Sequence, residues 1–153
     1  MTIGIVAFGP NAGVGIVAGL HTVETNGRGA IGGFVSLAAL TEDGRLLRAS
    51  IQDGGSKALF GTDVPTEIGQ AKLVGLISSG PNRPEPLSDF IAAEPGVGIV
   101  TGHRMPQTRV DDGIALNALV LAKMKSGLHP QAAVDQVIAM YPDMDAGFLA
   151  CST

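Results

Sequence analysis

The chain is poor in charged residues, has one cysteine and lacks any apolar run long enough to cross a membrane. Asp, Glu, Lys and Arg make up 16% of its 153 residues, whereas about 25% is usual in a globular domain. The single Cys151 cannot form an internal disulfide, which favours a reducing, cytoplasmic location. Because no run of about 18 apolar residues occurs, we expect no transmembrane helix and no membrane partner. No basic segment precedes an apolar run near residue 1, so no signal peptide is expected.

The charge pattern also disfavours nucleic acid as a partner. The formal net charge is −4, Lys and Arg form no cluster, and the few aromatic residues are scattered, whereas a nucleic-acid-binding surface needs a basic patch. Hydrophobic residues make up 45% of the chain. A lightly charged surface with so many small apolar residues predicts that copies of the chain bury part of it against one another as a homo-oligomer.

Two further absences limit the kinds of site. The three histidines, His21, His103 and His129, lack the spacing of zinc ligands, so we expect no metal site. Gly13 and Gly15 form a Gly-x-Gly pair without the rest of a dinucleotide-binding pattern, so we expect no cofactor. The length of 153 residues fits one domain, covering residues 1–153.

Hydrophobic periodicity and turn residues predict both strands and helices. Six apolar or alternating segments are expected to be strands: Ile3–Phe8, Ile31–Leu40, Arg45–Gln52, Lys72–Ser78, Gly96–Thr101 and Ala146–Cys151. Four segments are expected to be helices: Ala12–Glu24, Leu87–Ala93, one capped by Asp111 or Asp112 and running to Ser126, and one started by Pro130. The segment Ser56–Gln70 is expected to be irregular. This order predicts an α+β sandwich with a mainly antiparallel sheet covered by helices.

The first helix is expected to bury the side that carries Val14, Val17, Leu20 and His21. Its glycines are expected where the helix packs closely against a neighbour. His21 is more simply a packed or interface histidine than a site residue.

The most informative segment runs from Gly27 to Gly55 and predicts a long β-hairpin. Asp43-Gly44 lies between two apolar runs, which is the strongest short-range signal for a hairpin turn. Glycines surround both open ends of the hairpin, at Gly27–Gly33 and at Gly54-Gly55. That arrangement predicts a site lined by backbone at the hairpin mouth.

Several short motifs, taken in order, resemble a known family. Ala30-Ile31-Gly32 stands where the family has a Thr-Ile/Val-Gly strand start, and Gln52–Gly55 stands where it has Thr-Gly-Gly or Thr-Asn-Gly. Gly98–Gly102 ends in Thr-Gly, Met124–Pro130 matches Met-x-x-Gly-x-x-Pro, and Asp145–Phe148 contains the Gly and Ala of the last strand. In this order the stretch from Ala30 to Thr153 resembles the nucleophile-bearing half of N-terminal nucleophile (Ntn) hydrolases, in particular the glycosylasparaginase and isoaspartyl peptidase group.

The resemblance implies an Ntn-hydrolase-like sandwich, but most of the family's catalytic and substrate-binding residues have no counterpart in this sequence. In the family the threonine that starts the hairpin is the nucleophile and its freed amine is the base; here that position is Ala30. The threonine that steadies the nucleophile corresponds to Gln52, and the family's substrate-binding Arg-x-Gly-Asp has no match. Thr101-Gly102 alone keeps the family's oxyanion-binding pair. The resemblance therefore implies a divergent amidohydrolase acting on a small amide or carboxylate-bearing molecule, or an inactive relative.

Thr2 offers a second position for a nucleophile. If Met1 is removed, Thr2-Ile3-Gly4 reads like the family's strand start, and a free Thr2 amine and hydroxyl would act as base and nucleophile. A threonine at an ordinary strand start explains the same residues more simply, because the following segment is helical rather than the second strand of a hairpin.

The candidate ligand-binding residues are polar side chains expected near the hairpin mouth: Arg28, Gln52, Asp53, His103 and Arg104. Together with Thr101 they would form a pocket for an anion or a carboxylate, since the planar fork of arginine matches that group. Simpler interpretations stay open: Arg28 pairs with Glu24, and Asp53 closes a turn. The competing functional class is a non-catalytic small-ligand-binding or structural homo-oligomeric protein.

Overall fold

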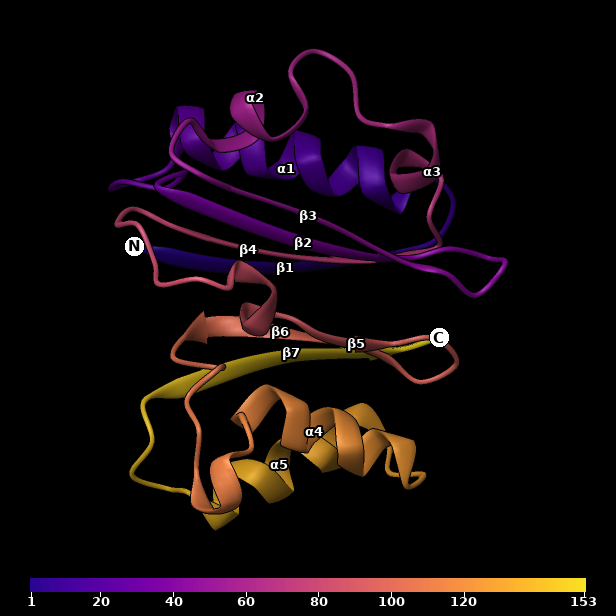
Figure 1. The fold of residues 1–153 in the computed structure, drawn as a ribbon, viewed down its shortest axis with the longest axis vertical. Coiled ribbons are helices and arrows are strands. Elements are labelled where there is room, and N and C mark those ends of the chain that lie inside the picture. The colour runs from indigo at the N-terminus through magenta and orange to yellow at the C-terminus, as the bar shows by residue number, and fades with distance from the viewer.

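The computed structural model describes residues 1–153 as a mixture of helices and antiparallel strands. Figure 1 shows four layers: the helices α1 to α3, a four-stranded sheet, a three-stranded sheet, and the helices α4 and α5. The predicted α+β class is confirmed, and the strands pair antiparallel throughout both sheets. The strands divide between two sheets that face each other, whereas the sequence had indicated one.

The first sheet contains the predicted hairpin. Its strand order is β1-β4-β2-β3, with β1 at Thr2–Phe8, β4 at Leu73–Ser79, β2 at Phe34–Leu40 and β3 at Leu46–Gln52. Residue pairs run from Phe34 opposite Gln52 to Leu40 opposite Leu46. Gly44 in the connecting turn has a φ of 81°, a conformation that glycine adopts without strain. The hairpin prediction is therefore confirmed, although β2 begins three residues later than expected.

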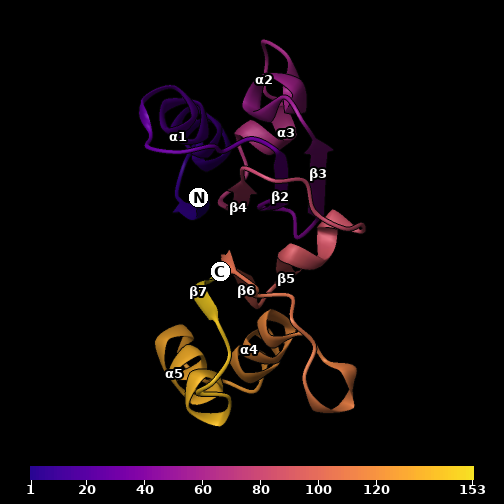
Figure 2. The same ribbon diagram turned by 90° about the vertical axis from the view of Figure 1, so that its left-hand side faces the viewer.

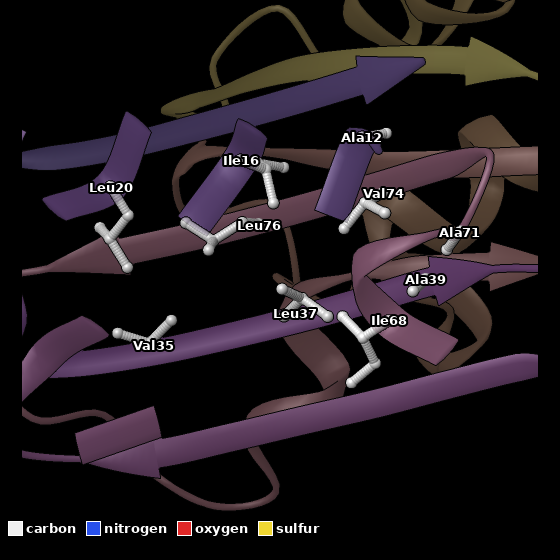
Figure 3. Close-up of a cluster of buried hydrophobic side chains, with 10 residues drawn as sticks. All are labelled: Ala12, Ile16, Leu20, Val35, Leu37, Ala39, Ile68, Ala71, Val74 and Leu76. Atoms are coloured by element: carbon white, nitrogen blue, oxygen red, sulfur yellow. The ribbon is translucent and has the colours of Figure 1, made fainter. Parts of the chain in front are cut away.

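Helices cover the outer face of the first sheet. They are α1 (Ala12–Asn26), α2 (Gly55–Phe60) and α3 (Thr66–Gly69). Figure 3 shows the ten buried side chains that fill this layer, here called the outer core: Ala12, Ile16, Leu20, Val35, Leu37, Ala39, Ile68, Ala71, Val74 and Leu76. No helix of the protein combines the length and the apolar content that crossing a bilayer would need.

One prediction about this layer is wrong and another is only partly confirmed. The segment Ser56–Gln70 holds α2 and α3, whose 6 and 4 residues are too few to produce a readable helical period. Leu20 of α1 is buried as predicted, together with Ala12 and Ile16, whereas Val14 is 50% exposed and His21 is also exposed. Gly13 has no side chain, so the backbone of α1 lies directly against the backbone of α3. This contact turns the neighbouring residues Ala12 and Ile16 towards the sheet.

The second sheet has the order β5-β6-β7, with β5 at Ala92–Glu94, β6 at Gly98–Arg104 and β7 at Ala146–Ser152. The helices α4 (Leu116–Lys125) and α5 (Pro130–Met140) cover it from outside. Their apolar faces meet β6 in a cluster that includes Val100, Leu116, Val120 and Val137. Pro130 starts α5 as predicted, because proline fits the first turn of a helix.

Two expected helices differ in the structure. Leu87–Ala93 begins as the short 3₁₀ helix η1 (Leu87–Phe90) and continues into β5. The helix expected from Asp111 or Asp112 starts only at Leu116, after the 3₁₀ turn η2 (Asp111–Gly113). Asp112 and Gly113 have φ angles of 65° and 72°, which lie in the left-handed region and interrupt any helix.

The two sheets share an apolar interior, here called the inter-sheet core. It contains Phe34, Ala38, Leu40, Leu73, Ile77, Leu87, Phe90, Ile91 and Ile99. Glycines allow the sheets to approach closely: a Cβ on Gly75 would lie 2.5 Å from Cγ2 of Ile99, and one on Gly4 would lie 2.7 Å from the carbonyl oxygen of Gly102. The strand β6 therefore lies directly across from β1 and β4.

Candidate functional site

The residues predicted to form a site lie at one end of the sandwich. Thr2, Ser79, Phe34 and Gln52 form one row across the first sheet, and β6 ends in the facing sheet at Arg104. Figure 2 views this end of the molecule, with the N-terminus towards the viewer. None of the main cavities of the protein is lined by Thr2, Arg28, Thr101 or His103.

Gln52 and Asp53 hold the loop that follows β4. The Gln52 amide donates to the carbonyl oxygen of Arg83 and accepts from the Arg83 backbone N–H at 3.2 Å. Asn82 donates to a carboxylate oxygen of Asp53 at 3.1 Å, and Asp53 has a φ of 59° in the turn after β3. These contacts use both side chains to fasten the loop onto the hairpin.

The charged candidates point to solvent. Arg28 is exposed and forms no ion pair, because Glu24 binds elsewhere. Arg104 forms an exposed ion pair with Asp145. The ring of His103 lies over the backbone of Gly147, where a Cβ would collide with it. Arg28, His103 and Arg104 lie on the surface of this end without converging on one cavity.

Thr101 and Gly102 lie in the interior. Thr101 is 0% exposed, and its hydroxyl oxygen has no hydrogen-bond partner in the protein. Gly102 packs so closely against the Gly147 carbonyl group that no Cβ would fit. The pair therefore lets β6 pack against its neighbours and lies away from solvent.

The two positions considered for an N-terminal nucleophile differ in their surroundings. Thr2 is half-buried at the start of β1, and the carbonyl oxygen of Met1 accepts a hydrogen bond from the Gly80 N–H at 3.3 Å. Ala30 is exposed and lies against Gly80. Neither residue borders a main cavity.

A hydroxyl group that the sequence analysis did not single out lies between an acid and a histidine. Ser56 Oγ donates to Glu24 Oε2 at 2.5 Å and lies 3.4 Å from His21 Nδ1. The backbone N–H of Ser56 donates to the other carboxylate oxygen of Glu24 at 2.9 Å. Ser56 is 5% exposed, whereas His21 is open to solvent. The carboxylate thus fixes the position of the serine from two sides.

The glycines at the open ends of the hairpin make room for this carboxylate. A Cβ on Gly32 would lie 3.1 Å from Glu24 Oε1, and one on Gly55 would collide with the same oxygen. Asp53, Gly54 and Gly55 all have positive φ angles, which turns the chain sharply from β3 into α2 and places Ser56 in the first turn of that helix. The sequence signal was a Gly-Gly-Ser run at the end of a strand, but the sequence separation of 32 between Glu24 and Ser56 concealed the pairing.

Ser56 lines a cavity of about 620 Å³ between α1 and the segment from α2 to α3. Val14, Val17 and Ala18 of α1 form its apolar wall. His21 and Lys57 lie beside Ser56 at its polar end. Pockets of this size hold small molecules, so the cavity offers an apolar surface next to a hydroxyl, an imidazole and a cation.

The structure shows neither a metal-binding cluster nor an activated cysteine. No three or more His, Cys, Asp or Glu side chains lie close enough together to hold a metal ion. Cys151 lies on β7, packed beside the inter-sheet core, and burial raises the pKa of its thiol above the usual value. A raised pKa keeps the thiol protonated at neutral pH, and the protonated form is a poor nucleophile.

We therefore expect Cys151 to react slowly with iodoacetamide at neutral pH. The rate should rise with pH through a midpoint above that of a cysteine in a short peptide, because only the thiolate reacts. Alkylation followed by intact mass gives both rates. A midpoint at or below that of the peptide would show that the thiol is activated.

Sequence comparison places the whole chain in one family. No curated protein matches the chain. A family model described as a domain of unknown function, DUF6963, matches residues 2–153. The match covers both sheets and all the helices described above. The chain belongs to the DUF6963 family.

Proposed function

We propose that the protein is a hydrolase of a small amide or ester, with Ser56 as its nucleophile. The observation that carries this proposal is the position of Ser56 Oγ, 2.5 Å from Glu24 Oε2 and 3.4 Å from His21 Nδ1, on the wall of a cavity of about 620 Å³. A serine hydroxyl is a weak nucleophile until an adjacent base accepts its proton. Here two groups capable of that role lie beside it.

The proposed reaction proceeds in two steps. Ser56 Oγ attacks the carbonyl carbon of the substrate, its proton passes to the Glu24 carboxylate, and the same proton is delivered to the amine or alcohol that leaves. A water molecule then attacks the acyl-serine ester, releases the acid and returns the proton to Ser56. His21 hydrogen-bonds Ser56 Oγ and orients it, and its distance of 3.4 Å is expected to shorten when substrate fills the cavity.

The cavity lining indicates the class of substrate. Val14 and Val17 would contact an apolar acyl group, while Lys57 at the polar end would favour a substrate that carries a carboxylate. The two antiparallel sheets with outer helices support an Ntn-hydrolase-like sandwich as the framework. In this proposal the reactive group is at Ser56, because the position that resembles the family's nucleophile is Ala30.

Labelling with a fluorophosphonate tests the nucleophile directly. We expect one adduct per chain, mapped by peptide mass to Ser56, and none in Ser56→Ala. Glu24→Gln should slow hydrolysis of p-nitrophenyl acetate by about 10²–10⁴-fold, the usual contribution of a positioned base. Circular dichroism of each variant separates loss of chemistry from loss of fold.

Two control variants sharpen this test. Ser126 is exposed after α4 and its hydroxyl bonds only to the Lys123 carbonyl oxygen, so Ser126→Ala should keep full labelling. Thr2→Ala should also leave labelling and turnover unchanged. Loss of activity in Thr2→Ala with full activity in Ser56→Ala would overturn the role of Ser56 and favour Thr2 after removal of Met1. No adduct in a folded wild-type chain would also overturn it.

A second candidate function is binding of a small ligand without catalysis. The observation that favours it is the burial of Ser56, whose hydroxyl is already bonded to Glu24. An intact substrate amide that shifts the NMR signals around the cavity without being cleaved would support this alternative. The association of copies, predicted from the low charge content, stays a prediction that sedimentation can test.

A further inference from the structure

We propose that a second cavity binds a small aliphatic carboxylate through Arg48. This cavity has a volume of about 470 Å³ and lies where β3, η1, β5 and the start of α4 meet. None of its lining residues is shared with the cavity beside Ser56. Binding in this cavity would therefore be independent of the proposed hydrolysis.

Arg48 lines this cavity, and two of its three guanidinium nitrogens make no hydrogen bond within the protein. Its Nη1 donates to the carbonyl oxygens of Ser88 at 3.2 Å and of Ile91 at 3.1 Å, which fixes the group over η1. An arginine has five N–H donors, and the Nε and Nη2 of Arg48 make no hydrogen bond within the protein. These two nitrogens form the planar fork that binds both oxygens of a carboxylate.

The positive charge of Arg48 has no ion-pair partner among the residues around the cavity. Asp89 pairs with Arg109 at 3.2 Å, and Arg109 also donates to the Gly113 carbonyl oxygen at 2.8 Å. Arg48 forms no ion pair with any carboxylate. Arg48 is exposed in part, and the partial burial of its guanidinium lowers its pKa, which the nearby charge of Asp89 offsets only in part. Two arginines and one aspartate give the cavity a net charge of +1, which a bound carboxylate would neutralise.

The remaining walls suit a short hydrocarbon chain. Ile91, Ile114, Ala115 and Ala118 provide apolar surface beside the guanidinium. Asn117 is buried and already bonded, donating to the Asp89 carbonyl oxygen at 2.8 Å and accepting from the Ala118 N–H at 2.8 Å. The Asn117 amide thus links η1 to α4, and these hydrogen bonds hold this side of the cavity in place without a ligand. A carboxylate head at Arg48 and a tail of a few carbons fit this arrangement.

Titration of the full chain with sodium butyrate, followed by two-dimensional ¹H–¹⁵N NMR, tests the site. We expect saturable shifts at the backbone amides of Ser88, Ile91 and Ala115. Arg48→Gln should weaken binding by at least about tenfold, the usual effect of losing a charge-assisted hydrogen bond. Arg48→Lys, which keeps the charge but lacks the fork, should bind with intermediate affinity.

Matched variants exclude the other arginines and the other cavity. Arg28→Gln and Arg104→Gln should bind butyrate as the wild type does, since both residues lie away from this cavity. Ser56→Ala should also bind normally, which separates this site from the proposed hydrolysis. Shifts that map elsewhere, binding that survives Arg48→Gln, or equal affinity for inorganic phosphate would each overturn the proposal.

Discussion

Replacing Phe34 by alanine is expected to lower the free energy of unfolding by about 3–5 kcal/mol, the range for removing a fully buried phenylalanine from a core. Phe34 is 0% exposed, and its ring lies 4.8 Å, between centroids, from that of Phe90. It joins β2 to η1 across the inter-sheet core, so its loss leaves a cavity between the two sheets. Urea denaturation followed by circular dichroism measures the change.

Phe8 provides the control for this prediction. It lies on β1 but is 57% exposed, and the Lys72 ammonium lies 5.5 Å from its ring centroid. An exposed cation–π contact contributes about 0.5–1 kcal/mol, so Phe8→Ala should have a small effect. Similar losses for Phe34→Ala and Phe8→Ala would contradict the packing of Phe34 between the two sheets.

Gly13→Ala and Gly15→Ala are expected to change stability in opposite directions although both lie in α1. Alanine is favoured over glycine in a helix by about 1 kcal/mol. Gly15 has nothing within 4 Å of a built Cβ, so Gly15→Ala should gain that amount. A Cβ on Gly13 would collide with the backbone carbonyl group of Ile68, which cannot rotate away as a side chain would. Overpacking of this kind costs about 1–3 kcal/mol or more, which outweighs the gain in propensity.

Thermal and urea denaturation of the two variants measure this difference. We expect Gly13→Ala to be less stable than Gly15→Ala by at least about 2 kcal/mol. Ser56 labelling in the Gly13 variant would show whether a displaced α1 carries His21 and Glu24 with it. Equal stabilisation by both substitutions would mean that α1 and α3 do not touch at Gly13.

The parts of the fold that were predicted correctly depend on signals local in sequence. Asp43-Gly44 fixed the hairpin turn, and Pro130 marked the first residue of α5, because each acts through its own backbone angles. The start of α4 was missed since the left-handed conformations of Asp112 and Gly113 replace the N-cap that the two aspartates suggested. The division into two sheets was missed because it depends on which faces of the strands meet.

In the candidate site, too, the sequence predicted local features but not contacts between distant segments. Gln52 and Asp53 were correctly placed at the hairpin mouth, but the structure uses them to hold residues 82 and 83. The contact of Ser56 with Glu24 depends on the crossing of α1 over the turn after β3. No periodicity or motif encodes that crossing, because it follows from the packing of three separate elements.

The close contacts between glycines and neighbouring backbone also limit which substitutions this sequence can accept during evolution. At Gly13, Gly33 and Gly102 the nearest group to a built Cβ is a backbone carbonyl, so even the smallest substitution disturbs the sandwich. Val14 in the cavity beside Ser56 and Ile114 in the cavity beside Arg48 carry no such restriction, because their side chains are exposed. We therefore expect substitutions to be tolerated at such cavity positions but not at these glycines, so membership of one family would not by itself imply a common substrate.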